Sequence, residues 1–196
     1  MNLRTEIAGE IPERSTHVRD AETRLVRRAR VDREAFAALY RSHVRTVSDY
    51  VYRRTGDPDL TQDLVSDVFV RALRAFPRFE SRGVPLRHWL LRIATHRLAS
   101  WAVRRRIGMS LDAVPEPALE TAQPTPRAAL ARRALHALPV RYQSALSLFH
   151  IEGLGVEEVA SVLGCSAGTI KSRLVRGRVL LREAILNMEK QDEPRP

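Results

Sequence analysis

Apolar residues recur every three or four positions along most of the chain, which is the periodicity of amphipathic helices. In the first half this pattern predicts a helix over residues 32–54, a second over 57–76 and a third over 85–106. Asp57 is suited to cap the second helix with Pro58 at its first position, and Pro85 opens the third. In 32–54 the apolar positions are Phe36, Leu39, Tyr40, Val44, Val47 and Val51, and in 57–76 they include Leu73 and Phe76.

The second half continues the same pattern. We expect a helix over 126–138 that Pro139 ends, another that Pro139 begins, and two more over 155–164 and 165–190. Alternation of period two, the mark of strands, is not found. The predicted fold is therefore all-α, with two small helical domains joined by a Pro-rich acidic linker and a helix-turn-helix in the second domain. The expected boundaries are 1–23 for a flexible N-terminal extension, 24–106 and 127–188 for the domains, 107–126 for the linker and 189–196 for a tail.

The linker prediction depends on one stretch, "IGMSLDAVPEPALETAQPTP". It holds four prolines and three acids and no basic residue, and prolines at this density interrupt helices and sheets. Fully extended it would reach about 65 Å, and as a flexible coil about 25 Å. Its acids either serve a partner or only keep the linker solvated.

Residues 156–175 fit the helix-turn-helix template. Ala160 is small where the two helices would cross, and Gly164 stands where the turn needs a positive φ. Ser166 is a suitable N-cap for the second helix, and Ile170 would close the core. The alternative is an ordinary helical hairpin. In the DNA-binding interpretation the contacts would come from Ser166, Ala167, Gly168, Thr169, Lys171, Ser172, Arg173, Arg176 and Arg178.

Two features of the first half also suggest binding. Asp59, Asp63 and Asp67 form an acidic stripe at i, i+4 and i+8, which suits a basic protein partner or is simply a solvated face. The following loop and helix are instead basic and aromatic, as in proteins that track single strands. We expect Phe79, between Arg78 and Arg82, to be the ring that stacks on a base, and Phe76 and Trp89 to be core.

The basic composition favours a nucleic acid or an acidic membrane surface as partner. The formal net charge is +10, and all of the 33 basic residues except Lys171 and Lys190 are arginines. Cys165 is the single cysteine and the six histidines are scattered, so we expect no disulfide, no metal site and no cofactor. Neither a phosphate-binding glycine loop nor a nucleophile with a partnered base is found, so we expect no enzyme. No signal peptide or membrane span is predicted, which favours the cytoplasm.

Three segments together resemble a bacterial RNA polymerase sigma factor of the extracytoplasmic-function (ECF) class in the sigma-70 family. "GDPDLTQDLVSDVFVRALRAF" and "WLLRIATHRLASWAVRRR" resemble its region 2, and "LPVRYQSALSLFHIEGLGVEEVASVLGCSAGTIKSRLVRGRVLLR" resembles its region 4. The resemblance covers residues 24–188 and implies core RNA polymerase (clamp helices and flap) and promoter DNA, duplex and single-stranded, as partners, with an anti-sigma factor in many members.

The resemblance also implies roles for residues. Asp59, Asp63 and Asp67 would meet the polymerase clamp helices, and the nine residues of the second helix of the helix-turn-helix would read the −35 element. The −10 element would be contacted by Arg78, Phe79, Arg82, Arg92, His96, Arg97, Ser100 and Arg104. His96 stands where the family usually has Asn, Ser100 where it has Asp, Ser66 where it has Gln, Gln143 where Arg is common, and Gly177 where Ala is common. The alternative to a sigma factor is a stand-alone LuxR-type helix-turn-helix regulator, which would have no use for the acidic stripe.

Overall fold

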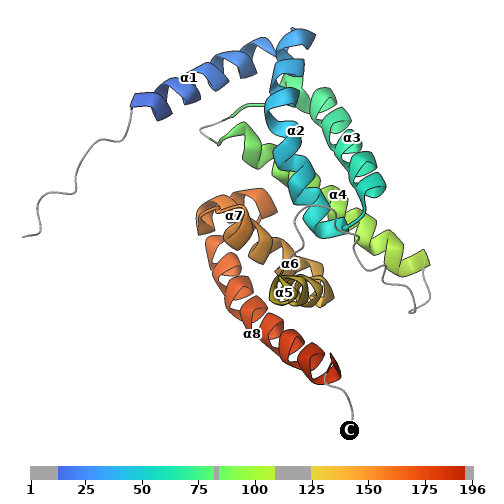
Figure 1. Ribbon diagram of the computed structural model, residues 1–196. Coiled ribbons are helices and arrows are strands. Elements are labelled where there is room, and N and C mark those ends of the chain that lie inside the picture. The colour runs from blue at the N-terminus through green and yellow to red at the C-terminus, as the bar shows by residue number, and fades with distance from the viewer. Residues whose placement is uncertain (1–12, 82–83, 109–124, 193–196) are drawn as a thin grey trace, which may run out of the picture.

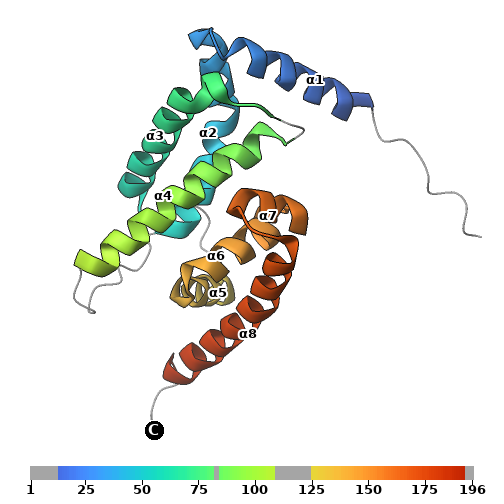
Figure 2. The same ribbon diagram turned by 180° about the vertical axis from the view of Figure 1, so that it is seen from behind.

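The computed structural model describes residues 13–81, 84–108 and 125–192, and all of its regular elements there are helices, which confirms the all-α prediction. Most of the predicted linker and the end of the tail lie outside these residues. The first lobe consists of α1 (Glu13–Arg28), α2 (Arg33–Thr55), α3 (Pro58–Ala75), the 3₁₀ turn η1 (Phe76–Arg78) and α4 (Leu86–Gly108). The second lobe consists of α5 (Pro126–Ala137), α6 (Val140–Leu146), the π-helical turn η2 (Ser147–Ile151), α7 (Val156–Leu163) and α8 (Ala167–Asp192). The two lobes lie side by side in both ribbon views (Figure 1, Figure 2).

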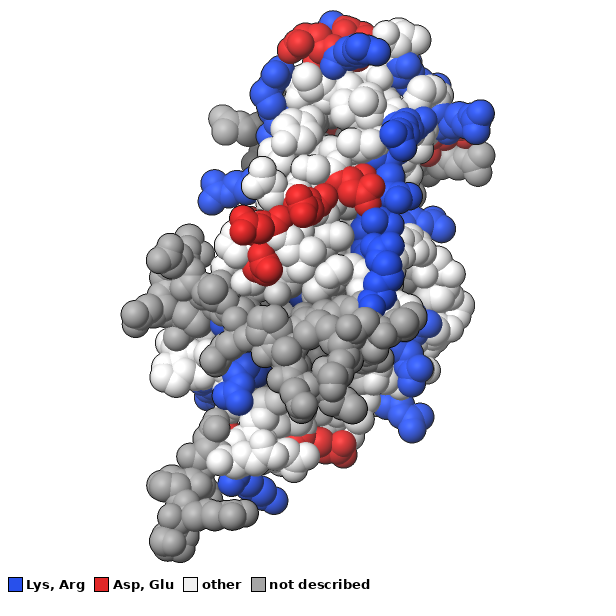
Figure 3. Space-filling model, turned by 90° about the vertical axis from the view of Figure 1, so that its right-hand side faces the viewer, with Lys and Arg blue, Asp and Glu red and all other residues white. Residues whose placement is uncertain are grey.

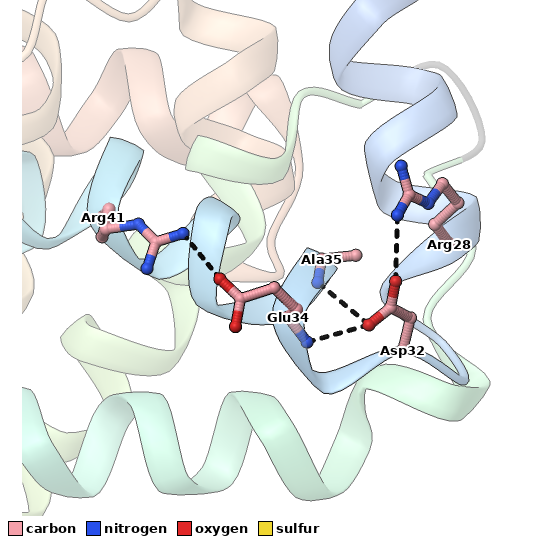
Figure 4. A network of polar contacts seen from close by, with 5 residues as sticks. All are labelled: Arg28, Asp32, Glu34, Ala35 and Arg41. Atoms are coloured by element: carbon pink, nitrogen blue, oxygen red, sulfur yellow. Dashed lines mark hydrogen bonds and ion pairs between the residues drawn. The ribbon is translucent and has the colours of Figure 1, made fainter.

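Side chains fix where the helices of the first lobe begin. The Asp32 carboxylate accepts hydrogen bonds from the backbone N–H groups of Glu34 (2.9 Å) and Ala35 (3.3 Å), which would otherwise have no helical partner (Figure 4). Arg28 donates to the same carboxylate at 3.0 Å and holds its pKa below the usual value. Asp57 caps α3 by accepting from the Leu60 N–H at 3.0 Å, as the sequence predicts. Part of α1 lies in the stretch predicted to be a flexible extension.

The core of the first lobe lies where α2, α3 and α4 meet. Val51, Val68, Leu91 and Ala94 are fully buried there, and the Tyr50 hydroxyl is 2.8 Å from that of Thr95. Burial of such side chains is the main term that holds the helices together. This core holds residues that are far apart in sequence, including Trp89 of α4, in fixed positions relative to one another.

The second lobe packs α5, α6 and α7 against the long helix α8. Leu148, Val159 and Ile170 are fully buried there, and Leu174 is 3% exposed. Gly177 of α8 lies against α6, so that a Cβ there would stand 3.1 Å from Leu146 Cδ1. This core holds the first turns of α8 at a fixed angle to α7.

The lobes touch along α4, which contacts α7 and α6. Among the residues that the structure describes, no helix is long and apolar enough to cross a membrane.

Candidate nucleic-acid interface

The turn between α7 and α8 has the geometry predicted for a helix-turn-helix. Gly164 adopts φ 65° and ψ 40°, in the left-handed region that glycine enters at little cost, and its N–H donates to the Ala160 carbonyl. The Ser166 hydroxyl accepts from the Thr169 N–H at 3.2 Å and so caps α8. Ile170 is completely buried between the helices. These observations confirm the predicted roles of Gly164, Ser166 and Ile170.

The outer face of the first turns of α8 is open to solvent. Gly168, Lys171, Ser172, Arg176 and Arg178 are exposed there. Small residues at the start of a helix allow a close approach to a DNA groove, and the basic side chains that follow reach phosphates or base edges. The face is therefore shaped and charged to bind duplex DNA.

Other predicted contacts on α8 are partly engaged within the protein. Ala167 and Thr169 are half-buried, and the Thr169 hydroxyl lies 2.9 Å from that of Ser166. Arg173 is half-buried with its guanidinium 3.7 Å from the Cys165 sulfur. Arg178 lies 3.4 Å from His150, whose pKa is lowered by burial and by this cation. Within the described part of the chain, Lys171 and Arg176 are the predicted basic contacts on α8 without such a bond.

A second polar line follows α4. Arg92, His96, Ser100 and Arg104 are exposed at intervals of four residues, so they share one face of the helix. The Ser100 hydroxyl donates to the His96 backbone carbonyl at 2.9 Å, so this bond does not involve the His96 ring. Arg78 is exposed on η1, and Arg82 lies outside the described residues.

Phe79 departs from the prediction of an exposed stacking ring. Its exposed fraction is 7%, and its ring centroid lies 4.5 Å from that of Trp89 and 5.6 Å from that of Phe76. Arg30 donates to its backbone carbonyl at 2.5 Å. Burial among other rings stabilises an aromatic side chain, so the ring is covered here, and its predicted contact with a base stays a prediction.

The acidic stripe on α3 divides into two parts. Asp59 and Asp63 are exposed, whereas Asp67 is half-buried, accepts a hydrogen bond from Arg71 at 3.0 Å and forms an ion pair with Arg97 of α4. Figure 3 shows the row of acidic side chains crossing the first lobe, with basic side chains beside one end. Arg97, predicted as a DNA contact, is thus turned toward α3.

Sequence reasoning missed the apolar continuation of this stripe. Val70 and Leu73 are 45% and 46% exposed on α3, although the sequence pattern places Leu73 on the apolar face of this helix. A groove between α2 and α3, lined by residues that include Tyr40, Tyr52 and Gln62, opens nearby. Exposed apolar side chains beside carboxylates are typical of a protein-binding surface. Among residues 13–81, 84–108 and 125–192, no group of three or more His, Cys, Asp or Glu side chains gathers to hold a metal ion.

Comparisons with known proteins agree with this arrangement. The family model for sigma-70 region 2 matches residues 39–107, and that for sigma-70 region 4 matches residues 128–181. The chain is 32% identical over 155 residues to the ECF RNA polymerase sigma factor SigE of Mycolicibacterium smegmatis, with 74% of this chain and 59% of that protein covered. It is 28% identical over 171 residues to the RNA polymerase sigma factor YlaC of Bacillus subtilis, with 82% and 96% covered. The chain thus spans less than two thirds of the first relative but nearly all of the second.

A solved structure is also similar. The sigma factor RpoE of Bartonella quintana, in complex with the anti-sigma factor NepR, has a TM-score of 0.63 and 25% identity, with 76% of this chain and 96% of that chain covered. CnrH, in complex with the cytosolic domain of CnrY, shares the fold at a TM-score of 0.62 and 24% identity, with 86% and 98% covered.

Proposed function

The chain belongs to the sigma-70 family of RNA polymerase sigma factors, in the ECF class, and on that premise we propose that it binds core RNA polymerase, directs it to specific promoters and helps to open the −10 element. The observation that carries the proposal is the order of the two matched regions, each on its own lobe and each with an exposed surface of the expected chemistry. A stand-alone LuxR-type regulator is not favoured, because it would not carry a region 2. Members of the family act as transcription initiation factors, and we propose that this chain acts beside the polymerase in the cytoplasm.

The first surface is for the polymerase. Asp59 and Asp63 present carboxylates, and Val70 and Leu73 add apolar area on the same helix. Apolar contact supplies affinity and the charges supply orientation and a faster encounter, so the combination suits the clamp helices. Asp67 contributes less, because its carboxylate is held by arginines of its own lobe.

The second surface is for DNA. We propose that α8 reads the −35 element through Lys171, Arg176 and their neighbours, and that Arg92, His96, Ser100 and Arg104 of α4 contact the −10 element. The exposure of these side chains supports both assignments. The similarity to RpoE, whose structure contains an anti-sigma factor, also supports the proposal that an anti-sigma factor binds this chain.

The experiment is promoter-directed transcription with core polymerase, together with a measurement of core binding. Asp63→Arg should weaken core binding by about tenfold or more, because a cation replaces an exposed carboxylate at the docking face. Glu34→Arg is the matched control, since Glu34 is exposed on the same lobe but on α2 rather than on α3. Unchanged affinity of Asp63→Arg, with unchanged helix content, would remove α3 from the docking site.

A second experiment addresses the −10 element. The double variant His96→Asn, Ser100→Asp should change the base preference in a randomised −10 library, because both side chains are exposed one turn apart and their hydrogen-bonding groups change. Preference at the −35 element should stay the same, since α8 lies on the other lobe. An identical −10 preference in wild type and double variant would show that these positions do not read bases.

A further inference from the structure

A dense group of arginines lies where α1 ends and α2 begins. Residues 24–33 hold five arginines and one acid, and all five arginine side chains are exposed. We call these five residues the basic corner: Arg24, Arg27, Arg28, Arg30 and Arg33. The match to the sigma-70 region 2 model begins at residue 39, so the basic corner lies outside the matched segment. Its charge therefore needs an explanation of its own.

Packing turns the helical part of the basic corner outward. On the inner side of α1, Val26 and Ala29 are 7% and 6% exposed and belong to the core of the first lobe. Arg24, Arg27 and Arg28 are spaced at three and four residues, so they share a face of the helix that points away from this core. The apolar side of α1 is thus occupied by packing, and its outer side is basic.

Most of this charge is not neutralised within the protein. Arg28 is paired with Asp32 at 3.0 Å (Figure 4), and Arg30 donates to a backbone carbonyl, which carries no net charge. Within residues 13–81, 84–108 and 125–192, no hydrogen bond or ion pair engages the other three arginines of the basic corner. Cations three and four residues apart on a helix repel each other. A polyanion bound at this surface would relieve that repulsion.

The basic corner adjoins the loop proposed to contact the −10 element. The Arg30 guanidinium donates to the Phe79 backbone carbonyl at 2.5 Å, which ties the turn after α1 to the residue that follows η1. Arg78, the residue before Phe79, is exposed. Both ribbon views show α1 running alongside the chain that leads from η1 toward α4 (Figure 1, Figure 2). A DNA strand held by Arg78 and α4 would therefore meet the basic corner where it leaves the loop.

The apolar content of the surface favours DNA over an acidic membrane. Helices that lie on membranes present a broad apolar face beside their cations. Here Val26 and Ala29 are buried in the core, and the exposed apolar side chain within residues 24–33 is Val31, at 93%. A single valine gives little area for insertion into lipid, whereas it is enough to touch the face of an unpaired base.

Resting on the proposed function, we propose that the basic corner binds phosphates of the single strand beyond the −10 element, on the side where the strand leaves the loop after η1. The contact is made to the backbone, so it does not depend on base sequence. From Arg24 to Arg30 the chain advances about 9 Å at the rise of a helix, which is the length of about two to three stacked nucleotides. The basic corner thus lengthens the −10 contact by about that number.

The test measures the binding of fluorescent single-stranded DNA to the holoenzyme that the full chain forms with core polymerase. The −10 sequence is taken from a template that the wild-type holoenzyme selects from a randomised library and transcribes. One oligonucleotide ends at the −10 element on both sides, and two others carry about four more nucleotides on one side or on the other, to cover the expected contact.

The wild type should bind one of the two longer strands more tightly than the short strand, by about tenfold or more. Each phosphate contact to a single strand contributes about fivefold at 0.1 M salt and about 0.7 to the log–log salt slope. The double variant Arg24→Gln, Arg27→Gln should therefore lose this gain and make the salt slope shallower by about 1.4, while it binds the short strand as the wild type does.

Matched variants separate a phosphate contact from general effects of charge. The double variant Arg127→Gln, Arg182→Gln removes the same charge from exposed positions on α5 and α8, and it should keep the gain. The double variant Arg24→Lys, Arg27→Lys should keep most of it, because a phosphate contact needs the cation. Circular dichroism checks that each variant retains its helices. Equal affinity of the wild type for all three strands, or an equal gain in the wild type and the Arg24, Arg27 glutamine variant, would overturn the proposal.

Two further measurements assign any other outcome. If the wild-type chain binds vesicles containing phosphatidylserine, the Arg24, Arg27 glutamine variant does not, and longer DNA brings no gain, the surface binds lipid and the proposal fails. Transcription by the same samples keeps the two proposals apart. A wild-type chain that directs no transcription refutes the proposed function and the DNA contact with it. A chain that transcribes but gains nothing from the longer strands refutes the basic corner alone.

Discussion

Replacing Phe79 distinguishes a core ring from a DNA-stacking ring. Phe79 is 7% exposed and touches two other rings, at 4.5 Å from Trp89 and 5.6 Å from Phe76. Truncation of a buried phenylalanine to alanine costs about 3–5 kcal/mol, and we expect about 3 kcal/mol here because the residue lies beside a surface loop. Domains are stable by about 5–15 kcal/mol, so this loss is large.

The conservative variant removes the aromatic contacts but keeps most of the volume. Each aromatic pair adds about 0.5–1.5 kcal/mol beyond burial, so Phe79→Leu should cost about 1 kcal/mol. Urea unfolding of the full chain, followed by tryptophan fluorescence, measures both variants, since Trp89 adjoins the site.

Single-stranded −10 DNA provides the second measurement. A ring that stacks on a base contributes about 1–3 kcal/mol to binding, which is about 5-fold to 150-fold in affinity. If Phe79 is a core residue, the holoenzyme with Phe79→Leu binds this DNA as the wild type does. A loss of tenfold or more in affinity, together with an unfolding free energy within 1 kcal/mol of wild type for Phe79→Ala, would refute the burial argument.

Three other predictions follow from the structure. Gly164→Ala should lower the free energy of unfolding by about 1–2 kcal/mol, because φ 65° is unfavourable for alanine although its Cβ would meet the Arg92 guanidinium only at an ordinary contact distance of 3.5 Å. An unchanged urea midpoint would contradict the left-handed turn. Lys171→Ala or Arg176→Ala should make the salt dependence of duplex binding shallower by about one unit in log–log slope if the lost contact is to a phosphate. Unchanged affinity and unchanged slope in both variants would show that α8 is not the recognition helix. Burial lowers the pKa of His43 and of His88 below 6.5, so the unfolded chain takes up protons first as pH falls. The free energy of unfolding should therefore decrease below about pH 6.5. Urea unfolding at pH 7.5 and 5.5 should show a smaller decrease for His88→Gln than for the wild type.

The helix-turn-helix could be predicted from sequence because its determinants are local. Gly164, Ser166 and Ala160 act on backbone within a few residues of themselves, and each contact is fixed by helix geometry. Leu73 and Phe79 could not be placed in the same way. Whether a side chain at the edge of an apolar face is covered depends on the crossing of α3 with α2 and α4, which periodicity does not give.

Glu152 shows the same limit more strongly. Its ion-pair partners Arg53 and Arg87 in the first lobe lie 99 and 65 residues away in sequence, and a π-helical turn directs it toward them. No spacing rule links positions in two different lobes. The nearest signal in the sequence is that a glutamate precedes a glycine at the end of an apolar segment, and this is common to many turns.

In a chain of net charge +10, the effect of substituting an acidic residue depends on where that residue lies. An exposed carboxylate such as Asp63 costs little to keep and is available to a basic partner, so its reversal should change binding and not folding. Asp67 neutralises Arg97 between α3 and α4, so its reversal would leave a partly buried cation facing another and should lower stability first. Glu152 neutralises arginines of the other lobe, so its loss should leave each lobe folded and weaken the contact between them. Weakened polymerase binding by an Asp67 variant is therefore evidence for docking only after its stability has been measured, whereas for Asp63 the binding measurement stands alone.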